Sequence, residues 1–174
     1  MTNSDVIERH IISVLVDNEP GVLARVIGLF SGRGYNIESL TVAEVDSQKH
    51  LSRISIVTSG TPMVIEQIKS QLARLVPIHS VCDLTEIGAS IERELALVKI
   101  INSGDDRIEA LRIADTFRAR TLDSTLESFV FEITGTSSKV AAFIDLMQSL
   151  GEVEISRTGV SAISRGNRID LSAK

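Results

Sequence analysis

The sequence is poor in aromatic residues, and this shortage argues against one large class of functions. Aromatic residues make up 3% of the chain, with no Trp and a single Tyr, Tyr35. Proteins that bind single-stranded nucleic acids stack bases on aromatic side chains, and nucleic-acid-binding domains carry a basic patch. This chain instead has a formal net charge of -5. We therefore expect no nucleic-acid partner.

Cysteine is also scarce, because Cys82 is the only one and no internal disulfide can form. Such usage is typical of a reducing compartment. No run approaches the ~18–20 apolar residues that a membrane-spanning helix needs. The polar start of the chain lacks the apolar stretch of a signal peptide. We expect a cytoplasmic protein that does not bind a membrane.

Residues that carry catalysis or bind metals are few and scattered. His10, His50 and His79 lie in separate segments without the spacing of a metal site. Cys82 lies in an apolar stretch, where a free cysteine behaves as a small hydrophobic residue. The glycine-containing segment Ser31–Gly34 follows a predicted helix, so it is typical of a helix end rather than of a phosphate loop. We predict no catalytic residue and no metal site, and hence a chain that is not an enzyme on its own.

Apolar periodicity in the first half predicts a βαββαβ module, the order of a ferredoxin-like fold with two helices on one face of an antiparallel sheet. Strands are expected at residues 9–17, 35–45, 51–60 and 79–87, and the two helices are expected to begin at Pro20 and Pro62.

The first strand is apolar on both of its faces. Ile12, Val14 and Val16 share one face by the period of two, whereas Ile11 and Leu15 lie on the other. A strand of this kind calls for a second covering surface, such as another chain.

The same order recurs more loosely in the second half, after a connector at residues 88–94. Strands are expected at residues 95–101, 127–134 and 152–163, a short strand or loop at 120–123, and helices at 108–119 and 137–150. The first of these helices is expected to bury Ile108, Leu111, Ala114 and Phe117. The sequence therefore predicts an α+β protein with two tandem ferredoxin-like domains, at residues 7–87 and 92–165.

The junction between the first strand and the first helix, residues 17–26, offers the best candidate for a binding site. A helix N-terminus presents free N–H groups and a positive dipole end, which together bind anions such as a carboxylate. Gly21 would let a ligand approach the backbone, and Asn18 offers a donor and an acceptor. With apolar neighbours and a later amide, an α-amino acid could be held by Asn18, Gly21, Val22, Leu23 and Asn36. On these residues alone, an ordinary helix start explains the pattern equally well.

The stretch from Asn18 to Asp46, NEPGVLARVIGLFSGRGYNIESLTVAEVD, resembles the regulatory small subunit of acetolactate synthase, also called acetohydroxyacid synthase. Further segments similar to this family lie at residues 51–60, 65–78, 92–100 and 158–166, so the resemblance covers about residues 7–168. It implies an N-terminal ACT domain, which is an amino-acid-sensing βαββαβ module, followed by a second ferredoxin-like domain.

The resemblance also implies a partner and a role. Small subunits of this family form homodimers and attach to a larger catalytic subunit that holds thiamine diphosphate, Mg²⁺ and FAD. That subunit condenses pyruvate with pyruvate or 2-oxobutyrate and opens the synthesis of valine, leucine and isoleucine. The small subunit activates it and confers feedback inhibition by valine.

The family's effector site lies between two ACT domains. The matched positions are Asn18, Gly21, Val22 and Leu23 of one chain, with Asn36 and Ile37 of the neighbouring chain. Relatives often have a serine where this chain has Pro20, which removes one possible donor.

Three alternative functions remain. An enzyme could use Cys82 or a histidine, although no acid–base pair is clustered in the sequence. An RNA-binding ferredoxin-like module would need aromatic residues on its third strand, and LSRISIVTSG has none. A free-standing ACT-type sensor could regulate a different enzyme, although the resemblance through the second domain argues against it.

Overall fold

The computed structural model describes residues 6–167 and 169, which form two compact units. Unit 1 combines the chain up to Ile91 with the chain from Val160 onward, and unit 2 is the intervening segment Glu92–Gly159. The main elements of unit 1 are β1 (Glu8–Asp17), α1 (Val22–Arg33), β2 (Ser39–Asp46), β3 (Leu51–Gly60), α2 (Pro62–Leu72), β4 (Ile78–Asp83) and β9 (Ser161–Ser164). Those of unit 2 are the greater part of β5 (Ser90–Ile101), then α3 (Asp105–Phe117), β6 (Arg120–Ser124), β7 (Ser128–Gly135), α4 (Ser137–Gln148) and β8 (Glu152–Arg157).

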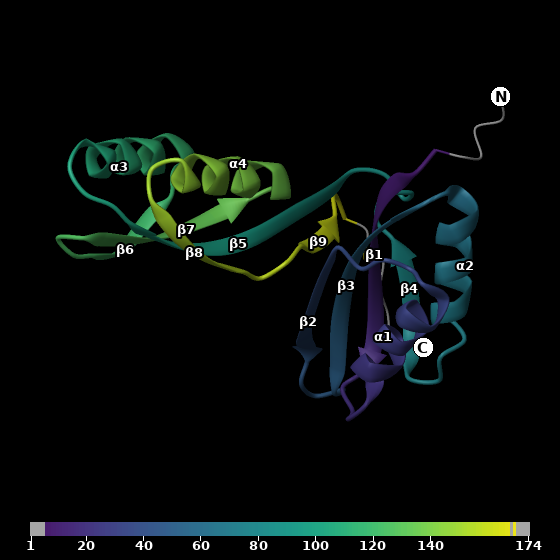
Figure 1. Cartoon of the computed structure of the whole chain (residues 1–174). Coiled ribbons are helices and arrows are strands. Elements are labelled where there is room, and N and C mark those ends of the chain that lie inside the picture. Colours follow the sequence, from purple (N-terminus) through teal and green to yellow (C-terminus); the bar gives the residue numbers. More distant parts are fainter. Residues whose placement is uncertain (1–5, 168, 170–174) are drawn as a thin grey trace. The chain divides into compact units, whose positions relative to one another are not determined.

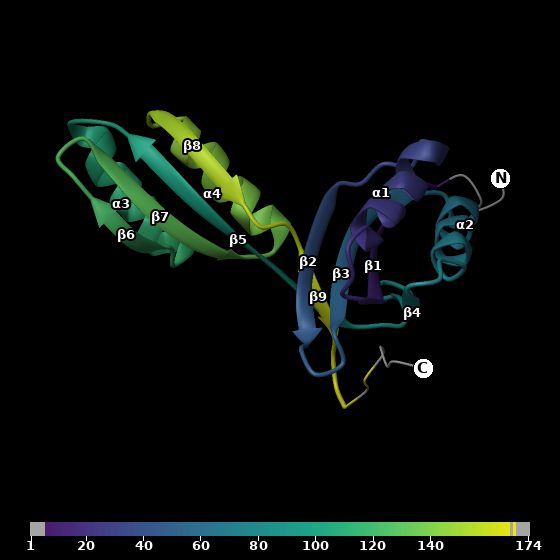
Figure 2. The same cartoon turned by 90° about the horizontal axis from the view of Figure 1, so that it is seen from below.

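In unit 1 the strands form an antiparallel sheet in the order β2-β3-β1-β4, and both helices lie on one face of it (Figures 1 and 2). The predicted βαββαβ order is confirmed. The period of two on β1 turns Ile12, Val14 and Val16 toward the helices. There they pack against the buried side of α1 and α2, which consists of Val22, Val26, Phe30, Ile65, Ile68 and Leu72.

The other face of this sheet is covered by the same chain. Ile11 and Leu15 of β1 pack with Val57, and the cover consists of Val160 and Ala162, at the start of the C-terminal part of unit 1. Part of the second covering surface expected for β1 is therefore supplied by a segment that lies after unit 2 in the sequence. We refer to residues 160–164 as the return segment.

Unit 2 repeats the arrangement, with strand order β6-β7-β5-β8 and with α3 and α4 on one face of the sheet (Figure 1). Its core is built from alternate residues of β5 and β7 packed against the helices, in particular Val98, Ile100, Phe131, Phe143 and Met147. Two tandem ferredoxin-like modules are thus present, as predicted. None of the helices in the described part of the chain is long and apolar enough to cross a membrane.

The inward face of α3 differs from the prediction. Ala110 and Ala114 are buried, but Ile108 is 69% exposed and Leu111 is also exposed, so these two do not belong to the core. One residue before Ile108, the Arg107 guanidinium lies 4.0 Å from the centroid of the Phe129 ring in a cation–π contact. The buried side of α3 therefore runs through Ala110 and Ala114, with Ile113 and the predicted Phe117 packed against the same core, and Ile108 and Leu111 fall outside it.

Several strand boundaries also differ. β2 begins at Ser39 instead of residue 35, where the N–H of Tyr35 still donates to the carbonyl of Phe30 at the end of α1. β4 ends at Asp83 instead of residue 87, because the Asp83 carboxylate accepts hydrogen bonds from the N–H groups of Thr85 and Glu86 and closes a turn. β5 begins at Ser90, within the expected connector. The expected last strand, residues 152–163, is broken at Gly159, whose φ of 86° is a left-handed conformation that favours glycine. Unit 2 ends there.

Two isoleucines of unit 2 test this assignment of the core. Ile100 is fully buried, so Ile100→Ala is expected to lower the free energy of unfolding by about 2–5 kcal/mol. Ile108→Ala removes the same atoms from an exposed position and should change it by less than about 0.5 kcal/mol. Urea denaturation followed by circular dichroism measures both. Comparable losses for the two variants would contradict the orientation of α3.

Candidate functional site

The candidate site begins at a tight turn between β1 and α1. The N–H of Val22 donates to the carbonyl of Glu19 over 3.4 Å, which closes a turn with Pro20 and Gly21 at its two central positions. Gly21 has φ 88° and ψ -8°, as the third residue of a type II turn requires. The helix begins at Val22, not at Pro20 as predicted, because the left-handed Gly21 is its N-cap.

The first turn of α1 leaves donors open to a ligand. No side chain caps this helix end, and within residues 6–167 and 169 the N–H groups of Leu23 and Ala24 have no hydrogen-bond partner. A Cβ added to Gly21 would meet no atom within 4 Å, so the space in front of the turn is open. Free N–H groups at the positive end of a helix dipole are suited to a carboxylate.

Asn18 lies beside this turn and is held by β-strand neighbours. Its backbone N–H donates to the carbonyl of His50 over 2.7 Å, and its side-chain amide donates to Glu44 Oε1 over 3.2 Å. The side-chain carbonyl oxygen of Asn18 and the carboxylate of Glu44 are therefore hydrogen-bond acceptors near the start of α1. Glu44 was not among the predicted residues, because only the pairing of β2 with β3 brings it beside Asn18.

The predicted apolar contacts are not equivalent. Val22 is buried in the core of unit 1, so its side chain is not available to a ligand. Leu23 is 38% exposed on the adjacent side of α1 and can still offer an apolar surface.

Asn36 and Ile37 are not brought to this turn within one chain. The carbonyl of Asn36 accepts from the Thr58 hydroxyl over 2.7 Å, which fixes the backbone while the side chain remains exposed, and Ile37 packs on the core. Along β3, Leu51 pairs with Asp17 whereas Val57 pairs with Ser39. The stretch of β3 from Leu51 to Val57 spans about 20 Å. The predicted site residues thus form two groups at opposite ends of β2.

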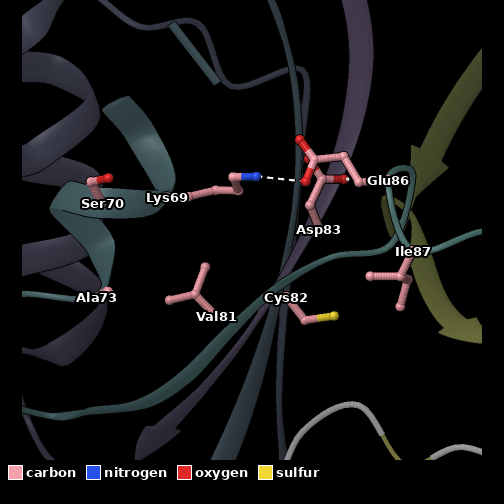
Figure 3. A pocket seen from close by; sticks show the side chains of 8 residues that line it. All are labelled: Lys69, Ser70, Ala73, Val81, Cys82, Asp83, Glu86 and Ile87. Carbon is pink, nitrogen blue, oxygen red and sulfur yellow. Dashed lines mark hydrogen bonds and ion pairs between the residues drawn. The ribbon is translucent and has the colours of Figure 1, made fainter. Parts of the chain in front are cut away.

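A separate cavity of about 490 Å³ opens between α2 and β4 on the side away from β2 (Figure 3). Lys69 reaches across it from α2 and donates to Glu86 over 2.6 Å. Burial acts to lower the pKa of the Lys69 ammonium group, but hydrogen bonds and charges from Glu86 and Glu66 outweigh burial and raise this pKa above its ordinary value. The Lys69 ammonium group is therefore held between two carboxylates.

One group of potential metal ligands lies beside this cavity, formed by His10, Asp83 and Glu86. His10 Nδ1 lies 2.7 Å from Asp83 Oδ2, and both side chains are buried. Glu86 is already paired with Lys69, whose positive charge would oppose a metal cation at this position. The arrangement is that of a structural cluster joining β1, β4 and α2.

The βαββαβ order of unit 1, with both helices on one face of its sheet, is the arrangement of an ACT domain. Two family models match the chain: "AHAS small subunit-like ACT domain" over residues 12–80 and "Small subunit of acetolactate synthase" over residues 93–166. The chain belongs to the acetolactate synthase small-subunit family.

Similar proteins agree with this assignment along nearly the whole chain. The acetolactate synthase isozyme 3 small subunit of Escherichia coli is 48% identical over 162 residues, which cover 92% of this chain and 98% of that protein. The acetolactate synthase small subunit of Haemophilus influenzae is 45% identical over 92% of this chain and 98% of its own length. The crystal structure of the small subunit from Thermotoga maritima is 41% identical, superposes with a TM-score of 0.82, and covers 92% of this chain and 99% of that chain.

The conformation of Gly21 can be tested by two substitutions. Gly21→Ala meets no atom but places a Cβ at a positive φ, so it should lower the free energy of unfolding by about 1 kcal/mol. Gly21→Asn should lower it less, because asparagine adopts the left-handed conformation more readily. Equal losses in urea denaturation for the two variants would contradict the turn described above.

Proposed function

We propose that this chain is the regulatory subunit of acetolactate synthase, which activates the thiamine diphosphate-dependent catalytic subunit and makes it sensitive to feedback inhibition by valine. Membership of the small-subunit family supports the catalytic partner. The observation that carries the effector role is the separation of the candidate site into two half-sites at opposite ends of β2.

Half-sites at opposite ends of an edge strand become adjacent in a symmetric dimer. β2 lies at the edge of the unit 1 sheet, and its outer residues Val42 and Val45 are exposed. If two copies pair their β2 strands in an antiparallel manner about a two-fold axis, the end of one strand lies beside the start of the other. Asn18 and Gly21 of one protomer then face Asn36 of its partner. We therefore propose a homodimer that forms two composite effector sites.

The chemistry of such a composite site matches an apolar α-amino acid. The free N–H groups of Leu23 and Ala24 would bind the carboxylate. The Asn18 carbonyl and the Glu44 carboxylate would accept hydrogen bonds from the ammonium group. Leu23 offers the apolar contact for a branched side chain, whereas the buried side chain of Val22 and the packed side chain of Ile37 serve to hold the backbone.

The reaction itself is assigned to the partner. Thiamine diphosphate, Mg²⁺ and FAD are proposed to reside in the catalytic subunit, and this chain contributes binding of the effector and activation. The subunit is proposed to act in the cytoplasm, on the pathway to branched-chain amino acids.

Reconstitution tests the proposed role. The purified chain alone should form no acetolactate from pyruvate, whereas its addition to the cognate catalytic subunit should raise the activity and make it sensitive to valine. A colorimetric acetolactate assay with and without valine measures both effects. Turnover by the small subunit alone would contradict the proposal. Activity of the catalytic subunit that does not respond to the added chain would instead favour a sensor for another enzyme.

Mixed dimers test the composite site. Asn18→Ala and Asn36→Ala should each weaken valine binding about tenfold or more, because each removes hydrogen bonds to a charged ligand. A dimer that pairs one chain of each variant should regain one intact site out of two. Calorimetric titration of differently tagged, co-purified chains measures the number of sites, with Asn167→Ala, at an exposed position, as the matched control. Mixed dimers without a restored site would rule out residues from two chains.

A further inference from the structure

The strand that follows Asn36 and Ile37 is fastened to the return segment by two side chains. The Ser39 hydroxyl accepts from the N–H of Val160 over 2.7 Å, and the Thr41 hydroxyl donates to the carbonyl of Val160 over 2.9 Å. Ser39 and Thr41 are two residues apart, so they share one face of β2. Both backbone groups of a single residue are therefore held by one strand.

Val160 is also fixed by packing. Its side chain is 2% exposed and lies in the apolar cluster with Ile11, Leu15 and Val57. After the return segment, the N–H of Arg165 donates to the carbonyl of Ala89 over 3.0 Å. The segment is thus bound to unit 1 along its length.

The residues just before Val160 are held equally firmly, but by unit 2. The N–H of Thr158 donates to the carbonyl of Leu95 over 3.0 Å, and the Thr158 hydroxyl accepts from the N–H of Leu95 over 3.1 Å. Gly159 is the only residue between this attachment and Val160. Gly159 alone therefore links the segment held by β2 to the segment held by β5, and a displacement of β2 would reach the end of β8 through this one residue.

We propose that Ser39 and Thr41 are coupling residues that transmit effector occupancy from β2 to the last strand of unit 2. This inference rests on the proposed function, because only Glu38 separates the proposed effector half-site at Asn36 and Ile37 from Ser39. The N–H of Glu38 donates to the carbonyl of Val57, so the residue between the half-site and Ser39 is already bound to the sheet. Neither hydroxyl belongs to the proposed ligand contacts, and a defect in coupling can therefore be separated from a defect in binding.

The test uses the full chain, alone and in complex with the catalytic subunit. The double variant Ser39→Ala/Thr41→Val removes both hydroxyls and retains strand-compatible side chains. Valine affinity of the free small subunit, measured by calorimetry, should stay within about twofold of wild type, and activation should persist. The valine concentration that half-inhibits the complex should rise by about tenfold or more, in the range of ordinary allosteric couplings. The matched control, Ser39→Thr/Thr41→Ser, keeps both hydroxyls and should behave as wild type.

Each remaining outcome decides the matter. Normal inhibition of the double variant would overturn the inference, and so would a loss of valine binding in proportion to the loss of inhibition. Failure of the wild-type protein to bind valine or to be inhibited would remove the proposed function, and the inference with it. If the double variant does not fold, a second variant with two glycines inserted after Gly159 tests the coupling. This insertion preserves both hydroxyl contacts to Val160 but lengthens the connection to Thr158. Loss of inhibition with normal valine binding supports the coupling, whereas full inhibition overturns it.

Discussion

β1 is buried on both of its faces, and the rest of unit 1 depends on this constraint. Its even-numbered residues from Ile12 to Val16 require the cover that α1 and α2 provide, and Ile11 and Leu15 require a second cover. An amphipathic helix pair satisfies only the first requirement. The second is met by the return segment, which forces the chain to come back to the first sheet after unit 2 is complete. The discontinuous division into units follows directly from the residue pattern of one strand.

The position of the candidate site follows from the same strand. β1 ends at Asp17, and the sharp turn through Gly21 starts α1 just after Asn18, whose side chain reaches Glu44 near the end of β2. The second half-site precedes β2 and lies at its far end. A single protomer therefore presents the two proposed half-sites and an exposed edge strand, and the pairing that would protect the edge would also bring the half-sites together.

Much of this arrangement could be predicted from the sequence, because apolar periodicity is a local signal. The sequence located the helices and strands of unit 1, and its glycines indicated the end of α1, which is the left-handed Gly34. It failed where a distant partner decides the outcome. Glu94 looked like part of a charged connector, yet it is buried because Arg157 and Ser137 bind its carboxylate. Ile108 looked like a core residue because it begins an apolar stripe with Leu111, and the sequence does not state that the stripe through Ala110 and Ala114 is the one that packs. The separation of Asn36 from Asn18 required the register of β2 with β3, which the sequence does not state.

The bond between Ser39 and Val160 joins residues 121 positions apart, and this has a consequence for synthesis of the protein. The N-terminal part of a chain leaves the ribosome first and begins to fold before the remainder exists. The first part of unit 1 is therefore assembled with one apolar face of its sheet bare. That face lacks the cover of the return segment until unit 2 and the return segment have been translated. An interrupted chain carries an open hydrophobic surface, which marks unfinished copies for association with chaperones or for degradation.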